Sequence, residues 1–121
     1  MSTLEVSNLN DGTTTVATTF VTNGSAKAWI IANQIAVADS FNASGTTDHG
    51  TGIYTYSFTN DFSSTNYAVS HEASKKGETF GLCLEDTAQR TAGSIKFEVY
   101  DIGNSLTDAS HVQQVYFGDM A

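Results

Sequence analysis

The sequence predicts an all-β protein, either an antiparallel β-sandwich or a compact barrel of about 7–8 strands. Thr and Ser are abundant, Pro is absent, and Lys, Glu and Leu are too few to fill long helices. Short segments of alternating apolar and polar residues recur along the chain, with turn-forming residues between them. A length of 121 residues suits a single domain.

The charge balance excludes several classes of partner. The net charge is −8, with 13 acidic and five basic residues. Nucleic acids and anionic membrane surfaces attract clustered Lys and Arg, so we expect neither as a partner. No apolar run approaches the ~20 residues of a membrane span. The N-terminus lacks a basic start followed by an apolar run, so we expect no signal peptide and no export by secretion.

The first quarter of the chain is predicted to differ from the rest. Residues 1–25 are expected to form an N-terminal extended arm or hairpin, and residues 26–121 the sandwich. Residues 10–12, Asn-Asp-Gly, predict a tight turn, and the Thr-rich residues 13–22 are expected to be extended. Such a polar segment cannot hold a core alone. It therefore packs on a partner chain or is an ordinary edge hairpin.

Residues 28–37, AWIIANQIAV, form the most apolar run. In an extended strand Trp29 and Ile31 share one face, and Ala28 and Ile30 share the other. A strand that is apolar on both faces is expected to be buried on both. Because the chain is small, the second cover is expected from another subunit, with Ala28, Trp29 and Ile30 as candidate interface residues. The polar pair at residues 33–34 predicts a bend in this run, and residues 42–47 predict a polar loop.

Residues 48–71 are predicted to form the centre of the core. A turn at Gly50 and Gly52 precedes a strand with an aromatic residue at every second position. A second strand follows at residues 67–71, and the polar loop between the two strands predicts that they pair antiparallel. The aromatic positions of the first strand are Tyr54, Tyr56 and Phe58, and the second strand places Tyr67, Val69 and His71 on one face.

Three further strands are predicted at residues 79–85, 94–101 and 111–118. In the first two strands, the alternation predicts which residues face inward. In the third strand, it places Tyr116 on the face opposite its apolar neighbours. The expected inward residues are Phe80, Leu82 and Leu84, then Ile95, Phe97 and Val99, with Val115 and Phe117 on the face of the last strand opposite Tyr116.

No catalytic residue, metal site or cofactor is predicted. The chain has no G-x-S-x-G motif, and its three histidines, His49, His71 and His111, lack the close spacing of a metal site. His49 is expected in solvent, and His71 is expected to be partly buried with a hydrogen-bond partner. A small enzyme or a carbohydrate-binding module remains an alternative.

The single cysteine and the acidic residues at strand ends receive structural interpretations. Cys83 is the only cysteine, so no intrachain disulfide can form, and we expect a buried, inert side chain. The carboxylates of Glu85, Asp86 and Asp101 could bind Ca²⁺ at strand ends. The regular calcium-loop pattern is absent, which disfavours that interpretation.

Several short motifs occur in a fixed order. The first is TNGSAKAW at residues 22–29, followed by DSFN at residues 39–42 and by TDHGTGIYTYSFTNDFSSTNYAVS at residues 47–70. Together they resemble a module of tail-fibre and other virion proteins of tailed bacteriophages, especially marine ones. The pattern of that family is an AKAW segment, an SFN strand, a TD-x-GTG-Y turn and an NY-x-V strand. The resemblance runs from about residue 12 to the final strand.

The resemblance implies a non-enzymatic virion component, a homotrimer on the particle surface. The expected function is that of a tail fibre, spike or tail-tip protein in host attachment, with a capsid decoration or head-fibre protein as the alternative. The expected partners are other copies of the chain, other phage virion proteins and a host surface glycan. The protein would be made in the host cytoplasm and released by lysis within the virion. Exposed loop residues are the candidate contacts: His49, Asn60, Asp61 and Asn104.

Overall fold

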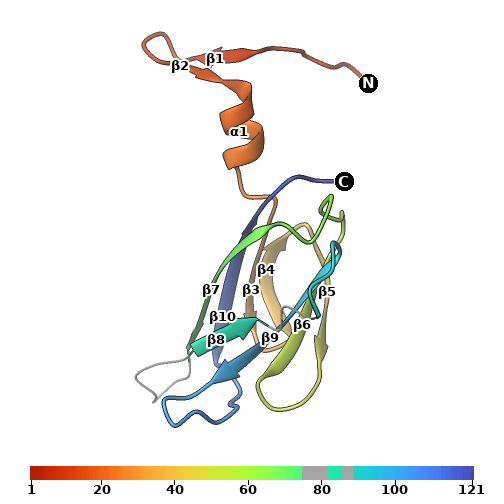
Figure 1. The fold of residues 1–121 in the computed structure, drawn as a ribbon, viewed down its shortest axis with the longest axis vertical. Coiled ribbons are helices and arrows are strands. Elements are labelled where there is room, and N and C mark those ends of the chain that lie inside the picture. Colours follow the sequence, from red (N-terminus) through yellow and green to blue (C-terminus); the bar gives the residue numbers. More distant parts are fainter. Residues whose placement is uncertain (75–81, 86–88) are drawn as a thin grey trace.

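The computed structural model describes residues 1–74, 82–85 and 89–121 and has the predicted all-β class (Figure 1). Its elements are β1 (Asn8–Asn10), β2 (Thr15–Ala17), α1 (Thr18–Gly24), β3 (Ala28–Asn33), β4 (Ala36–Phe41), β5 (Ala43–Asp48), β6 (Ile53–Phe58), β7 (Ala68–Ser74), β8 (Leu82–Glu85), β9 (Ser94–Tyr100) and β10 (His111–Phe117). Strands β1 and β2 form a hairpin. The others form two antiparallel sheets of order β4-β3-β10-β7 and β5-β6-β9-β8, named here the β3–β10 sheet and the β6–β9 sheet.

The two four-stranded sheets face each other in a sandwich-like arrangement around one core (Figure 1). Every second residue of the central strands points inward, and the buried residues of both sheets belong to a single cluster. Among the described residues no backbone ladder joins β4 to β5 or β7 to β8, so the sheets do not close into a barrel. The part of the chain that the structure describes has no helix long and apolar enough to cross a membrane.

The aromatic stripe of β6 lies at the centre of this core, as predicted. Tyr54 and Tyr56 are almost fully buried, at 0% and 1% exposed. The ring of Phe97 on the adjacent strand β9 meets Tyr56 edge-on, with 4.8 Å between the ring centroids. Phe58 meets Tyr116 of the opposite sheet at 4.9 Å, so these rings join the two sheets. The inward positions predicted for β9 are confirmed, because Ile95, Phe97 and Val99 are all buried.

The predicted pairing of this strand with the next one is wrong. Strand β6 pairs with β5 and β9, whereas β7 pairs with β10 in the other sheet. The loop between β6 and β7 therefore crosses from one sheet to the other. Phe62 and Tyr67 from this crossing are buried, with their rings stacked at 4.4 Å. Alternation predicts that a strand has one wet face, but it does not specify the neighbouring strand.

The apolar run at residues 28–37 forms two strands rather than one. Strands β3 and β4 are antiparallel neighbours, and the polar pair predicted to bend the chain lies at the turn between them, where Gln34 has φ +56°. Ala28 and Ile30 are each 1% exposed within the chain's own core. They cannot also contact another subunit, so the structure corrects these two interface candidates. Trp29 lies on the opposite, outward face of β3.

Residues 42–47, predicted as a polar loop, belong largely to the edge strand β5. This strand pairs with β6 through its backbone, with an irregularity in register between Ala43 and Gly45. Its side chains are mostly exposed, so it carries no apolar pattern by which the sequence could reveal it. The hydroxyl group of Ser44 donates a hydrogen bond to the carbonyl oxygen of Phe58 at 2.9 Å, next to this irregularity.

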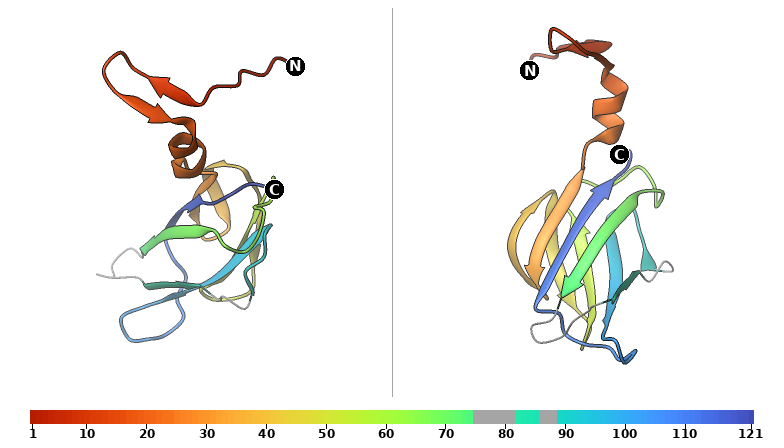
Figure 2. Two further views of the ribbon diagram at one scale, coloured as in Figure 1. Left: turned by 45° about the horizontal axis from the view of Figure 1, so that its top comes forward. Right: turned by 90° about the vertical axis from the view of Figure 1, so that its left-hand side faces the viewer.

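The N-terminal segment rises from one end of the sandwich (Figure 2). The predicted turn is present, because Gly12 has φ +99° between β1 and β2. The predicted extended conformation of residues 13–22 is wrong for its second half, which forms α1. None of residues 1–25 is buried. Residues 1–25 are called the arm below.

The predicted strands at residues 79–85 and 111–118 have different outcomes. Residues 79–81 lie outside the described residues, and β8 is described from Leu82. In β10, Tyr116 and Phe117 lie on opposite faces, as predicted, and the structure shows that Tyr116 points into the core and Phe117 points outward. The buried face of β10 also includes Val112 and Gln114, which alternation around Tyr116 places there.

Gly52 provides a test of the turn that precedes β6. Its φ is +71°, and an added Cβ would lie 2.7 Å from the carbonyl oxygen of Thr107 and 2.8 Å from that of Val99. Gly52→Ala should therefore cost about 2 kcal/mol or more, from the left-handed backbone and the collision with fixed carbonyls. Gly45→Ala, with open space around its Cβ, is the matched control. Equal unfolding midpoints of the two variants in urea would contradict this account.

Candidate functional site

The outward face of the β3–β10 sheet carries a patch of large apolar side chains. Strand register sets Phe41 of β4 and Val115 of β10 on either side of Trp29. The same face also carries Ile31, two residues after Trp29 in β3, and Phe117, two residues after Val115 in β10. Phe41 is 55% exposed and Phe117 is 37% exposed. These five residues are called the outer patch: Trp29, Ile31, Phe41, Val115 and Phe117.

Polar residues border the outer patch on the β7 side. The amide nitrogen of Gln113 donates a hydrogen bond to the Glu72 carboxylate at 2.8 Å, next to Ile31 in the register. Together with Trp29 and Ser70 they line a shallow groove of about 510 Å³. The three strands β3, β10 and β7 lie side by side in the right view of Figure 2 with no element in front of them. The patch is therefore open to a partner.

The arm carries a second apolar surface. Leu9 and Val16 are directly opposite each other in the β1–β2 hairpin, and with Val21 of α1 they line a shallow groove. Phe20 of α1 is 74% exposed, and Leu4 near the N-terminus is 84% exposed. Monomeric soluble proteins keep contiguous exposed apolar surface small, so these side chains are candidates for a contact surface.

The linker between the arm and β3 is held by hydrogen bonds. The Lys27 backbone N–H donates to the carbonyl oxygen of Tyr116 at 2.8 Å, which continues the β3–β10 ladder. The Lys27 ammonium group donates to the carbonyl oxygen and the hydroxyl group of Ser25, at 2.8 and 3.0 Å. These bonds direct the arm away from the sandwich, as Figure 1 shows.

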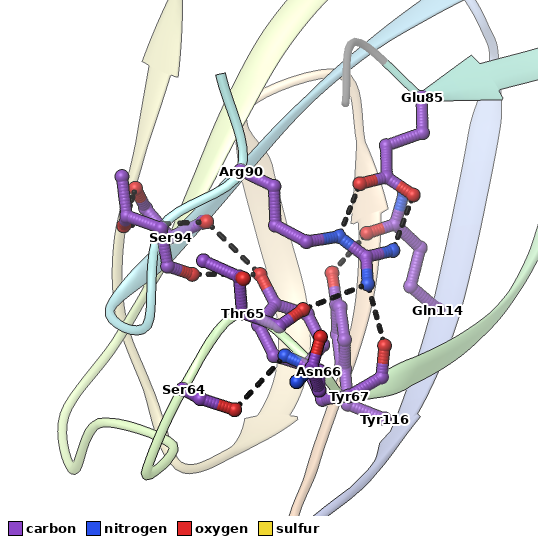
Figure 3. A network of polar contacts seen from close by, with 10 residues as sticks. Ser64, Thr65, Asn66, Tyr67, Glu85, Arg90, Ser94, Gln114 and Tyr116 are labelled. Carbon is purple, nitrogen blue, oxygen red and sulfur yellow. Dashed lines mark hydrogen bonds and ion pairs between the residues drawn. The ribbon is translucent and has the colours of Figure 1, made fainter. Parts of the chain in front are cut away.

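Inside the sandwich, Arg90 organises a polar network at the edge between β7 and β8 (Figure 3). Its guanidinium group donates two parallel hydrogen bonds to the carboxylate of Glu85. A third nitrogen donates to the carbonyl oxygens of Tyr67, at 2.6 Å, and Thr65, at 3.2 Å. The side chains of Arg90 and Glu85 are only 17% and 13% exposed. The pair therefore ties β8 to the chain entering β7.

Tyr67 connects this ion pair to the aromatic core. The Arg90 guanidinium carbon lies 4.5 Å from the centroid of the Tyr67 ring, a cation–π distance. The Tyr67 hydroxyl group lies 3.0 Å from the carbonyl oxygens of both Thr91 and Ser94. Burial raises the pKa of Tyr67 to about 12, so the hydroxyl group stays protonated and remains a donor.

The inner end of the network is neutral. The hydroxyl group of Tyr116 donates to the side-chain oxygen of buried Gln114, and the amide nitrogen of Gln114 lies 4.0 Å from the Cys83 sulfur. Burial raises the pKa of the Cys83 thiol to about 12, which makes it a poor nucleophile. His71 is half-buried, as predicted. Its Nδ1, however, has no hydrogen-bond partner among the described residues, contrary to the prediction.

The four predicted loop contacts do not form one site. His49 lies in the turn before β6, whereas Asn60 and Asp61 follow its last residue. Asn104 lies in the loop after β9, at the same end of the sandwich as His49 (Figure 1). Strand β6 has six residues, so about 20 Å separates the two ends.

Some of these polar groups have partners within the chain. The backbone and side-chain nitrogens of Asn60 both donate to the side-chain oxygen of Asn42, and the side-chain nitrogen of Asn42 donates to the carbonyl oxygen of Lys27. This arrangement holds the arm end of the sandwich together. At the other end, His49 Nε2 lies 2.9 Å from the Thr55 hydroxyl oxygen, and Asn104 has φ +62° in a turn.

The predicted Ca²⁺ alternative finds no assembled ligand set. The Asp101 carboxylate accepts the backbone N–H groups of Gly103 and Ser105 at 2.8 and 3.0 Å, while Glu85 binds Arg90. Asp86 lies outside the described residues. Within the described ranges, no group of three or more His, Cys, Asp or Glu side chains could hold a metal ion.

Comparison with known proteins returns no match: no family model, no curated protein and no solved structure is significantly similar to this chain.

The Arg90 pair predicts a strong dependence of stability on both partners. Arg90→Met should lower the free energy of unfolding by about 3 kcal/mol, because it leaves the Glu85 carboxylate buried without a partner. The double variant Arg90→Met/Glu85→Leu should recover most of that loss, since no unpaired charge remains. Urea unfolding of the single and double variants measures both effects. A single variant within 0.5 kcal/mol of wild type would contradict the structural role.

His71 predicts a pH dependence. Burial lowers the pKa of His71, with Glu85 opposing and Arg90 adding to the shift, so folding favours the neutral imidazole. Its contribution to stability is therefore complete above the unfolded pKa near 6.5 and is lost as the pH falls towards the folded pKa. The stability of wild type should fall relative to His71→Gln between pH 7 and 5 in urea unfolding. The control His49→Gln should follow wild type.

Proposed function

We propose that this chain is a non-enzymatic structural protein of a tailed-phage virion, a tail fibre, spike or tail-tip component that takes part in host attachment. The proposal rests on the ordered motifs that resemble those of such proteins and on the apolar arm that stands clear of the sandwich. The arm is the observation that carries it, because a free monomer gains nothing from exposed Leu4, Leu9 and Phe20. A subunit of a larger assembly can cover them.

The arm divides the molecule into an assembly end and a free end. The arm, the linker and the C-terminus lie at one end of the long axis, and the turns containing His49 and Asn104 lie at the other (Figure 1). In the proposed virion the assembly end contacts other copies of the chain, as a homotrimer, and other phage virion proteins. The free end would then face the host, and His49 and Asn104 would be the better placed of the four candidates to contact a surface glycan.

The interior of the sandwich suits this structural role. The most buried tyrosines, including Tyr54 and Tyr116, have pKa values raised by burial, and the Cys83 thiol is similarly held in its neutral form. The charged pair of Arg90 and Glu85 is saturated by its own partners. These groups stabilise the fold, and none of them is the activated nucleophile that acyl or phosphoryl transfer needs.

A capsid decoration or head-fibre protein is the second candidate. The same arm would serve it, because one short apolar segment can dock into a site repeated over a shell. Both candidates predict a protein made in the host cytoplasm and released with the particle on lysis. They differ in where the chain lies on that particle.

Immunogold labelling of purified virions tests the proposal and separates its two forms. An antibody to this chain should label the tail or its tip if the protein acts in attachment, and the whole capsid surface if it decorates the shell. Antibody that has been pre-absorbed with the purified chain is the control. Virions that contain none of the chain by immunoblot would overturn both candidates.

A further inference from the structure

The arm and the outer patch are two apolar surfaces of one chain, and the arm of that chain does not lie on its own patch (Figure 1). We infer that the arm of one copy packs on the outer patch of a neighbouring copy. This inference deepens the proposed self-association and rests on it, but it does not depend on a place in a virion.

The arm cannot be stable as an isolated element. Its strands have three residues each and its helix has seven, with no side-chain N-cap and no buried residue. Isolated helices shorter than about 12 residues are marginal in water, and so are isolated two-stranded hairpins. Some surface outside the arm must therefore stabilise it.

The exposed area of the chain is large for its mass. The accessible surface is 7380 Å², whereas a compact monomer of 12.9 kDa is expected to expose about 6,300 Å². The excess of about 1,100 Å² is similar to the roughly 800 Å² that one partner contributes to a standard protein–protein interface. An exchanged arm would account for it.

The linker decides which outer patch the arm can reach. Lys27 is held to Tyr116 through its backbone and to Ser25 through its side chain, and with these bonds in place the arm points away from its own sheet (Figure 1). A neighbouring copy presents the same patch without that restriction. The patch has the matching chemistry, since Phe41 and Phe117 expose aromatic rings beside the partly buried Trp29 at the arm end of the sheet.

Self-pairing of like surfaces is the less favourable arrangement. Arm-to-arm packing would leave every outer patch uncovered, and patch-to-patch packing would leave every arm uncovered. Arm-on-patch packing pairs each arm with one patch, so it covers both surfaces. Such a contact is heterologous, so it closes into a ring when its rotation permits, and a trimer is one such ring.

Two single variants and their mixture test the inference. Phe20→Asp removes the arm's exposed ring, and Phe41→Asp removes one from the patch. Both positions are exposed, at 74% and 55%, so the fold within each chain should persist, as circular dichroism can check. Wild type should sediment as an oligomer, and each variant alone as a single 12.9 kDa chain. An equimolar mixture should form a heterodimer, because one variant keeps an intact patch and the other keeps an intact arm.

Trp29 is the only tryptophan of the chain and lies within the patch, so its fluorescence reports whether the patch is covered. Acrylamide should quench Trp29 weakly in the wild-type oligomer and more strongly in Phe20→Asp. Ile102→Asp is the matched control, because Ile102 is 73% exposed and lies in the loop at the opposite end. It should leave both mass and quenching unchanged.

Three results would overturn the inference. One is an oligomer that survives Phe41→Asp, which would indicate arm-to-arm packing. Another is a mixture of the two variants that stays monomeric. The third is a monomeric wild type, which would also exclude the proposed self-association. The immunogold experiment would still test the virion assignment in each case.

Discussion

Phe58 of the β6–β9 sheet contacts one aromatic ring of the opposite sheet and two rings of the segment that connects the sheets. Its ring centroid lies 4.9 Å from Tyr116, 5.1 Å from Phe62 and 5.8 Å from Tyr67, each in an edge-on arrangement. Such pairs contribute about 0.5–1.5 kcal/mol each beyond the area they bury. Because β6 and β7 belong to different sheets, this cluster is what holds the crossing between them in place. The positions of the linker, the C-terminus and the loop ends all depend on that crossing.

The polar network of Arg90 joins β8 to the chain that enters β7. No backbone ladder joins β7 to β8 in the described part of the chain, so the sandwich is open along that edge. Arg90 supplies the missing connection, because one planar group binds the Glu85 carboxylate, the Tyr67 carbonyl oxygen and the face of the Tyr67 ring. Arginine suits this position because its guanidinium group forms parallel hydrogen bonds while stacking on an aromatic ring. These charges serve the fold, and the surfaces available to partners lie elsewhere.

Those surfaces are apolar and lie towards the arm end of the molecule. A net charge of −8 makes copies of the chain repel one another at long range, so any self-association has to come from close apolar contact. In the self-association inferred above, the outer patch and the arm would provide that contact in complementary form. The free end of the sandwich instead carries polar turns, whose backbone is held by bonds such as that from the Gly52 N–H to the Asp108 carboxylate.

The sequence by itself determined the fold class and the core, because period-two alternation is a local property that each strand carries in its own residues. The buried positions of β6 and β9 follow from it directly. The edge strand β5 escaped detection because both of its faces are polar, and α1 because its residues bury nothing.

Only the tertiary structure decided that β6 and β7 lie in different sheets, that Ile30 is internal while Trp29 faces outward, and that His49 and Asn60 lie at opposite ends. It also brought together Arg90, Glu85 and Tyr67, which no local spacing connects. The physical reason is that strand pairing and the facing of two sheets are set by contacts between residues far apart in the chain, and alternation within one strand contains no record of its neighbour.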